Sequence, residues 1–332
     1  MNSIYKLSFF LFLFSFTAIS AHAKIEIQKR ESSKELSLKT DFRKDIVYKI
    51  TDRNDSLKLD IYRPQNSENR ALPVVMYIHG GAWVLEDKVI PANSYEEKTI
   101  LKLLANGFAV VSINYRLVND SVHFPLPSED CKDAVRWLRK NKEKYSFDTS
   151  HIGLWGGSAG GHLCLLTAYS GDEQYQGDSL LSAYSSKVDY VMDDFGPTEL
   201  NDLFRTKIGR AKLFFFKLLM KKIVEFRTEL MFAMTGHDPY KEKEKVFESF
   251  KHISPLYMTS QGVPTQILHG SKDKIVPLKQ SELLRKSLTE KGIECDLHII
   301  RKANHAFLSI PEETKEEVSD LLVKYALRHS QK

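Results

Sequence analysis

A serine inside a glycine-rich turn is the first residue of this sequence that could carry out chemistry. Ser158 lies in the segment 156–160, which fits the pattern G-x-S-x-G. The apolar run 151–155 before it predicts a short buried strand, and the segment 161–170 after it predicts a helix. A strand, a sharp turn and a helix in this order form a nucleophile elbow, which presents a serine hydroxyl on a strained turn. We therefore expect Ser158 to be a nucleophile.

Two downstream residues could activate this serine. A serine hydroxyl needs a general base, and the base needs an acid that fixes its tautomer. Asp273 follows the strand-like run 265–268, and His305 follows the strand-like run 295–300, which gives the order Ser, Asp, His. Open α/β sheets place their sites at the carboxyl ends of strands, so we expect these three residues to form a catalytic triad.

Other carboxylates and imidazoles stay open as alternatives. The rival acids are Asp193, Asp194 and Asp296, and the rival bases are His269 and His298. Asp296 and His298 lie inside a strand pattern rather than on a loop, and His269 precedes the turn of the acid loop. These positions make Asp273 and His305 the favoured pair.

A glycine-rich segment upstream could stabilise negative charge. The apolar run 74–78 predicts a buried strand, and it leads into the segment 79–83, His-Gly-Gly-Ala-Trp. Acyl transfer develops an oxyanion, and one fixed N–H donor at that point accelerates the reaction by about 10²–10³-fold. The segment matches the oxyanion loop of the HGGG type, with Ala82 in place of the last glycine. We expect oxyanion donors from the amides of Gly81, Ala82 and Ala159.

The other residues of this loop have supporting roles in our interpretation. We expect His79 and Gly80 to brace the loop rather than to transfer protons. Trp83 has two readings that the sequence leaves open: it lines the substrate pocket, or it packs in the core.

Together these motifs resemble the hormone-sensitive-lipase-like and bacterial feruloyl-esterase-like branch of the α/β-hydrolases. The resemblance rests on the segments 79–83, 156–160, 269–277 and 303–307, and it extends over about residues 45–328. It implies an esterase that needs neither a metal nor another cofactor. One departure is Asn304, which stands where members usually carry glycine before the base. Asparagine tolerates left-handed backbone conformations, so we expect the loop to be preserved.

The elements that must position these residues follow from hydrophobic patterning. Two hairpin-like strands at about 45–50 and 57–62 precede alternating strands and helices. Buried strands that alternate with helices imply a mostly parallel central sheet with helices on both faces. We therefore predict an α/β-hydrolase fold over residues 45–332, preceded by a linker or arm at 24–44.

The segment at about 199–250 interrupts the alternation and predicts a small helical cap. Residues 212–234 are rich in Phe, Leu and Met with basic residues between them, and their apolar positions crowd more than one face of a single helix. A lipid-surface helix is the less favoured alternative, because basic amphipathic helices also bind interfaces.

Composition narrows the class of protein further. The 332 residues are 42% hydrophobic, which suffices for one large core. The formal net charge of +5 is a mild excess without an arginine-rich arm, so nucleic-acid binding has no support. We interpret Cys131, Cys164 and Cys295 as buried thiols, and no Cys/His spacing indicates a metal site.

The first 23 residues have the pattern of a signal peptide. Lys6 precedes an apolar run at 7–19, and residues 21–23 are Ala-His-Ala, which fits an A-x-A cleavage site. We expect cleavage near Ala23 and a secreted or periplasmic location.

These observations predict a serine carboxylesterase that acts on small acyl esters, such as acetyl, feruloyl or short-chain esters, on a small-molecule or carbohydrate alcohol. Three alternatives stay open: an arylformamidase-like amidase, a serine peptidase, and a hydrolase-fold binding protein without catalysis.

Overall fold

The computed structural model describes residues 32–67, 70–308 and 310–330. The predicted signal peptide at 1–23 and the first part of the predicted arm lie outside these residues. Within the described part, the strands are β1 (Thr40–Ile50), β2 (Ser56–Pro64), β3 (Leu72–Ile78), β4 (Ala109–Ile113), β5 (Phe147–Gly157), β6 (Tyr190–Asp194), β7 (Thr265–Gly270) and β8 (Cys295–Ile300).

These strands form one sheet in the order β1-β2-β4-β3-β5-β6-β7-β8. The hairpin strands β1 and β2 are antiparallel to each other, and β2 is antiparallel to β4, whereas all later pairs are parallel. Parallel strands that are buried on both faces have nearly continuous apolar sequences, and β3 and β4 fit this rule. The predicted mostly parallel sheet is confirmed.

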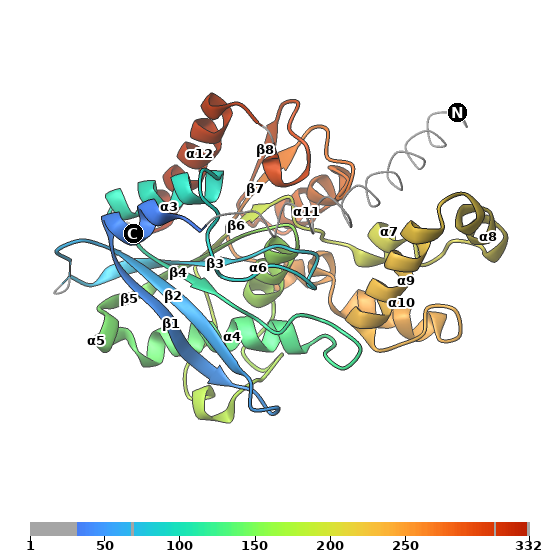
Figure 1. Cartoon of the computed structure of the whole chain (residues 1–332), viewed down its shortest axis with the longest axis horizontal. Helices are drawn as coiled ribbons and strands as arrows, with labels where there is room; N and C mark the ends of the chain where they lie inside the picture. The colour runs from blue at the N-terminus through green and yellow to red at the C-terminus, as the bar shows by residue number, and fades with distance from the viewer. Residues whose placement is uncertain (1–31, 68–69, 309, 331–332) are drawn as a thin grey trace.

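Helices cover both faces of this sheet (Figure 1). They are α2 (Lys34–Lys39), α3 (Tyr95–Ala105), α4 (Leu126–Lys140), α5 (Lys142–Tyr145), α6 (Ala159–Tyr169), α7 (Leu200–Phe204), α8 (Arg210–Leu219), α9 (Lys221–Thr235), α10 (Lys243–His252), α11 (Lys279–Glu290) and α12 (Glu312–Ser330). One core cluster lies under α3 and α12, and the other lies under α4, α6 and α11. None of the helices in the described ranges has the length and apolar character needed to cross a bilayer.

The arm predicted at 24–44 is wrong over its described second half. Residues 34–39 form α2, and β1 begins at Thr40 rather than at about residue 45. A register shift between Arg43 and Ile46 breaks the alternation of side chains in β1, and its first half carries several charged residues. A strand with an irregularity of this kind lacks a clear period-2 pattern, so its start was hidden in the sequence.

The single helix predicted at 212–234 is also wrong, because the chain leaves the helical region at Met220, with φ −145° and ψ 50°. This residue separates α8 from α9. The buried positions of α9 include Val224, Leu230 and Met234. The apolar residues of this segment therefore lie on two helices rather than on one. The helices α7 to α10 follow β6 and precede β7 in the chain, which is where the cap was expected. They gather at one side of the molecule (Figure 1).

Candidate active site

Ser158 occupies the turn between β5 and α6. Its backbone has φ 55° and ψ −118°, a strained conformation for a residue with a side chain. The Ser158 amide donates to the carbonyl of Asp194 at 2.8 Å. A side chain at Gly160 would overlap the carbonyl oxygen of Ile78, so a residue without Cβ is required there. The glycines of the motif therefore let α6 pack close to β3, and the serine is held at the top of the turn.

The predicted acid and base converge on this serine. His305 Nε2 lies 2.9 Å from Ser158 Oγ, and His305 Nδ1 lies 2.7 Å from Asp273 Oδ2. Because a carboxylate only accepts, Nδ1 carries the proton, and Nε2 is left with a lone pair toward the serine hydroxyl. This arrangement can remove a proton from Ser158.

The acid is held in place by its own loop. Asp273 Oδ1 accepts from the amides of Ile275 and Val276 at 2.8 and 3.0 Å. Burial by itself would raise the pKa of Asp273, but the charge of His305 and hydrogen bonds from His269 and His305 outweigh it and hold this pKa well below its usual range. The side chain is fully buried and remains a carboxylate at neutral pH.

The loop that carries the base departs from one sequence-based expectation. Asn304 has φ −89° and ψ −174°, which is extended backbone, so its tolerance of left-handed conformations is not used. The left-handed residues are instead Ala306 and Phe307, with φ 58° and 49°. Phe195 contacts the His305 ring edge-on at 4.9 Å between centroids and helps to fix its plane.

The predicted oxyanion loop has three successive residues with positive φ. The values are 88° at Gly81, 51° at Ala82 and 63° at Trp83. A Cβ at Gly81 would overlap the carbonyl group of Leu85, so glycine is required there. Ala159 is the first residue of α6, and the first amides of a helix have no partner within it. These two segments can therefore direct backbone N–H groups toward a substrate at Ser158.

His79 is buried behind this loop. Its ring stacks on Tyr115 at 4.4 Å, and its Nδ1 donates to the carbonyl of Gly80 at 3.1 Å. Tyr115 donates its hydroxyl hydrogen to the same carbonyl at 3.0 Å. Burial lowers the pKa of His79 to about 4, so its ring is neutral near pH 7. This geometry fits the bracing role expected for His79 and Gly80.

Trp83 packs in the core and does not face solvent, since only 3% of it is exposed. Its indole Nε1 donates to His162 Nδ1 at 3.2 Å, and the two rings meet edge-on. Of the two roles expected for Trp83, packing in the core is the one found in this structure. The sequence reasoning missed His162, although its position four residues after Ser158 on a predicted helix places it one turn below the nucleophile.

The rival acids and bases have other partners. His269 is buried, lies 2.7 Å from Ser281 Oγ through Nδ1, and donates from Nε2 to the Val276 carbonyl at 2.9 Å, so it supports the acid loop. Asp194 accepts from Trp155 and Tyr95 at 2.8 and 3.0 Å.

Asp193 accepts from the amide of Gly196 at 2.9 Å. The other two rivals, Asp296 and His298, lie on β8. Asp296 pairs with Arg328 at 2.6 Å, and His298 lies within the strand. The structure therefore brings together Ser158, His305 and Asp273. Of the rivals, His269 contacts the acid, with 3.4 Å between its Nε2 and Asp273 Oδ2, but no rival stands between Asp273 and Ser158 in the place of His305.

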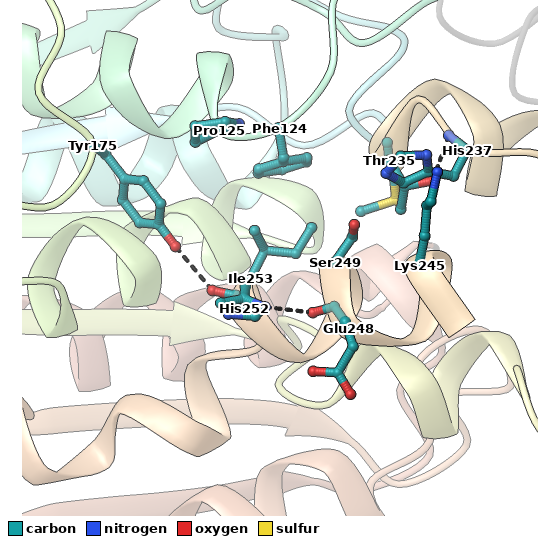
Figure 2. Close-up of a pocket in the computed structure, with 11 residues that line it drawn as sticks. Phe124, Pro125, Tyr175, Thr235, His237, Lys245, Glu248, Ser249, His252 and Ile253 are labelled. Carbon is teal, nitrogen blue, oxygen red and sulfur yellow. Dashed lines mark hydrogen bonds between the residues drawn. The ribbon is translucent and has the colours of Figure 1, made fainter. Parts of the chain in front are cut away.

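A cavity of about 460 Å³ lies between the helices α9 and α10 and the segments that carry Phe124 and Tyr175. Figure 2 shows Phe124 and Pro125 on one side of it, with Tyr175 and the residues of α9 and α10 around the rest. The Tyr175 hydroxyl donates to the His252 carbonyl at 3.0 Å. Phe124 contacts the ring of His162 edge-on at 5.6 Å between centroids. The ring of Phe124 therefore lies between the cavity and His162, which is the residue that Trp83 of the oxyanion loop contacts.

Cys131 and Cys164 are buried free thiols and Cys295 is partly buried. Across the ranges that the structure describes, no group of three His, Cys, Asp or Glu side chains could hold a metal ion.

The fold and the hydrogen-bonded serine, histidine and aspartate define an α/β-hydrolase with a serine-centred site. The chain belongs to the BD-FAE family, whose model matches residues 59–288. It is similar to esterase LipC of Mycobacterium tuberculosis, with 28% identity over 255 residues that cover 76% of this chain and 55% of the relative. Esterase LipQ of the same organism is also 28% identical, with 75% and 54% covered. The chain thus spans about half the length of these curated relatives.

Solved structures with the same fold include several esterases. A truncated carbohydrate esterase from gut microbiota has a TM-score of 0.68 and 24% identity, with 90% of this chain and 100% of that chain covered. A bifunctional GH43-CE protein of Bacteroides eggerthii has a TM-score of 0.67 and 26% identity, with 86% and 35% covered. A butyrate-bound esterase of Thermogutta terrifontis has a TM-score of 0.62 and 22% identity, with 86% and 94% covered. The predicted fold and family resemblance are confirmed.

Proposed function

We propose that this protein is a serine carboxylesterase that hydrolyses small acyl esters through a Ser158–His305–Asp273 triad. The observation that carries the proposal is the pair of short contacts at His305, 2.9 Å to the serine and 2.7 Å to the aspartate. Membership of the BD-FAE family and similarity to two named esterases support the ester bond as the target.

In the first half of the reaction, Ser158 Oγ attacks the ester carbonyl while His305 Nε2 takes its proton. Asp273 stabilises the imidazolium that forms. The carbonyl oxygen becomes an oxyanion and accepts hydrogen bonds from the amides of Gly81, Ala82 and Ala159. Collapse of this intermediate breaks the ester C–O bond, and His305 gives its proton to the leaving alcohol.

In the second half, water attacks the acyl-enzyme. His305 removes a proton from the water, a second oxyanion forms in the same place, and the C–O bond to Ser158 breaks. The carboxylic acid leaves, and Ser158 recovers its proton from His305. The cycle is complete with side chains, backbone amides and water.

We propose acetyl, feruloyl or short-chain acyl groups on a small-molecule or carbohydrate alcohol as the substrate class. The titles of structural relatives support this range, since one is a carbohydrate esterase and others contain butyrate or propionate.

The test is hydrolysis of a p-nitrophenyl ester series, from acetate to decanoate, by the purified chain and by its Ser158→Ala variant. The proposal predicts activity that peaks at short acyl chains and disappears in the variant. A folded wild-type protein that hydrolyses none of the series, and whose Ser158 does not react with a fluorophosphonate probe, would overturn it. Reaction with the probe but not with esters would favour an amide substrate instead.

We also propose export of the protein, on the signal-like pattern of residues 1–23. Fractionation of cells that express the full chain, with N-terminal sequencing of the product, tests this. Export predicts a periplasmic or extracellular product that begins near residue 24, and an uncleaved product in the cytosol would contradict it.

A further inference from the structure

The proposed oxyanion hole is assembled from two separate elements. Gly81 and Ala82 belong to the loop after β3, whereas Ala159 belongs to α6, which follows β5. An oxyanion donor must lie within about 2.7–3.1 Å of the developing charge. The hole therefore works only if the loop is held at a fixed distance from the beginning of α6.

The loop by itself does not favour its observed conformation. Ala82 and Trp83 have left-handed φ values of 51° and 63° although both carry a Cβ, and such residues persist only where their surroundings impose them. Backbone bonds from Val84 and Leu85 to the Gly81 carbonyl, at 3.1 and 2.9 Å, close the loop on itself. These bonds do not connect it to α6.

One side-chain hydrogen bond makes that connection. Trp83 Nε1 donates to His162 Nδ1 at 3.2 Å, and both side chains are at most 3% exposed. His162 is part of α6, and its amide donates to the Ser158 carbonyl at 3.0 Å. The bond thus joins the loop to the turn of helix that carries both Ser158 and Ala159.

The second nitrogen of His162 fixes the role of the first. Nε2 lies 2.7 Å from the carbonyl of Ile253, which only accepts, so Nε2 carries the hydrogen and Nδ1 is the acceptor. Phe124 contacts the same ring edge-on and adds to its confinement. Phe124 and Ile253 also line the cavity of Figure 2, so His162 lies between that cavity and the oxyanion loop.

We propose that His162 is a positioning residue of the oxyanion hole: by accepting the indole hydrogen bond of Trp83, it sets the distance between the Gly81–Ala82 amides and the Ala159 amide. This inference rests on the proposed esterase function. It assigns to His162 no contact with the substrate and no proton transfer.

Two substitutions at the same position separate the two bonds of His162. Asparagine places an amide oxygen near the place of Nδ1 and can still accept from Trp83, whereas glutamine reaches toward the place of Nε2 and Ile253. We expect His162→Gln to lower kcat for p-nitrophenyl acetate by about 10- to 100-fold, below the full loss of one oxyanion donor, with KM changed less than about twofold. His162→Asn, the rescue variant, should lower kcat by only about threefold.

Trp83→Phe removes the donor from the other side. It should lower kcat as His162→Gln does, and the double variant should be no worse than either single variant, because both remove the same bond. A trifluoromethyl ketone forms a hemiketal oxyanion with the serine, so its affinity should fall in parallel with kcat. Cys164→Ala, a fully buried change on the same helix, is the control for stability.

The inference is overturned if folded His162→Gln and Trp83→Phe proteins keep wild-type kcat, or if Cys164→Ala of equal thermal stability loses as much kcat as they do. A wild-type protein without esterase activity would contradict the proposed function instead. In that case ¹⁵N NMR of the histidine rings still tests the link. An unprotonated, hydrogen-bonded Nδ1 in His162 supports it, and a protonated Nδ1 overturns it.

Discussion

His305 Nε2 lies 2.9 Å from Ser158 Oγ, although 147 positions separate the two residues in the chain. Ser158 follows β5 and His305 follows β8, and the two strands are separated in the sheet by β6 and β7. Parallel strands bring their carboxyl ends to one edge of a sheet, and the loops after them then meet. The contact is therefore a product of the parallel sheet.

Asp273→Asn should lower kcat/KM for p-nitrophenyl acetate by about 10³–10⁴-fold with little change in fold. The amides of Ile275 and Val276 would keep the asparagine oxygen, which leaves its NH₂ group facing His305 Nδ1. The imidazole would then carry its hydrogen on Nε2 and could not accept the serine proton. Asp296→Asn, a change at a rival acid, is the matched control and should leave kcat/KM within about twofold. Equal losses in the two variants would refute the assignment of the acid.

Asp193→Asn should stabilise the protein more at pH 8 than at pH 5. Burial raises the pKa of Asp193 to about 7, and the amide of Gly196 at 2.9 Å only partly offsets it. A raised carboxyl pKa favours folding below the unfolded value near 4, and this contribution is lost as the pH rises toward 7. The neutral asparagine avoids this loss of unfolding free energy, which amounts to at most about 4 kcal/mol for a pKa that rises from near 4 in the unfolded chain to about 7 in the folded protein. Urea unfolding at both pH values measures the difference, and equal changes in unfolding free energy at pH 5 and pH 8 would contradict the burial argument.

Gly160→Ala should destabilise the fold by about 3 kcal/mol or more, because the new Cβ would overlap the backbone of Ile78 and could not move away. Gly209 is the matched control. A Cβ there has no neighbour within 4 Å, and its φ of −70° suits any residue. Gly209→Ala should therefore change the unfolding free energy by less than about 1 kcal/mol. Thermal unfolding of the two variants tests the pair. Similar melting temperatures would contradict the prediction, because they would mean that β3 and α6 can move apart without a loss of stability.

Lys49→Met should destabilise the protein by about 1.5–3 kcal/mol, the range for hydrogen bonds to charged groups, since Asp130 keeps Arg116 and Asp133 keeps Arg136 as partners. Lys49 Nζ lies 2.7 Å from Asp130 and 2.6 Å from Asp133, and both carboxylates are fully buried on α4. Its removal would leave these carboxylates short of a positive charge and would weaken the contact of β1 with α4. The control is Lys39→Met, at an ion pair with Glu35 that is mostly exposed, where we expect less than about 0.5 kcal/mol. Chemical denaturation at pH 7 compares the two, and equal losses would contradict a role for burial.

The candidate triad and the parallel sheet could be predicted from the sequence because their signals are local. Ser158 lies within its own strand–turn–helix pattern, and the acid and the base each follow a short apolar run directly. Each signal depends on residues that are neighbours in the chain.

Other features depend on contacts between distant segments or on backbone angles, which no local pattern reports. The hydrogen bond between Trp83 and His162 joins residues 79 positions apart. The break between α8 and α9 at Met220 is a matter of backbone angles, with φ −145° and ψ 50° at that residue. The left-handed conformation near the base belongs to Ala306 and Phe307 rather than to Asn304.

The sequence by itself therefore determined which residues stand at the ends of which strands, and with them the chemistry that this site can carry out. Only the tertiary structure decided how the oxyanion loop is held against α6 and which imidazole nitrogen accepts the indole hydrogen. The physical reason is that strand order and turn chemistry are encoded by neighbouring residues. The distance between two elements is instead set by the packing of side chains that come together only when the sheet has formed.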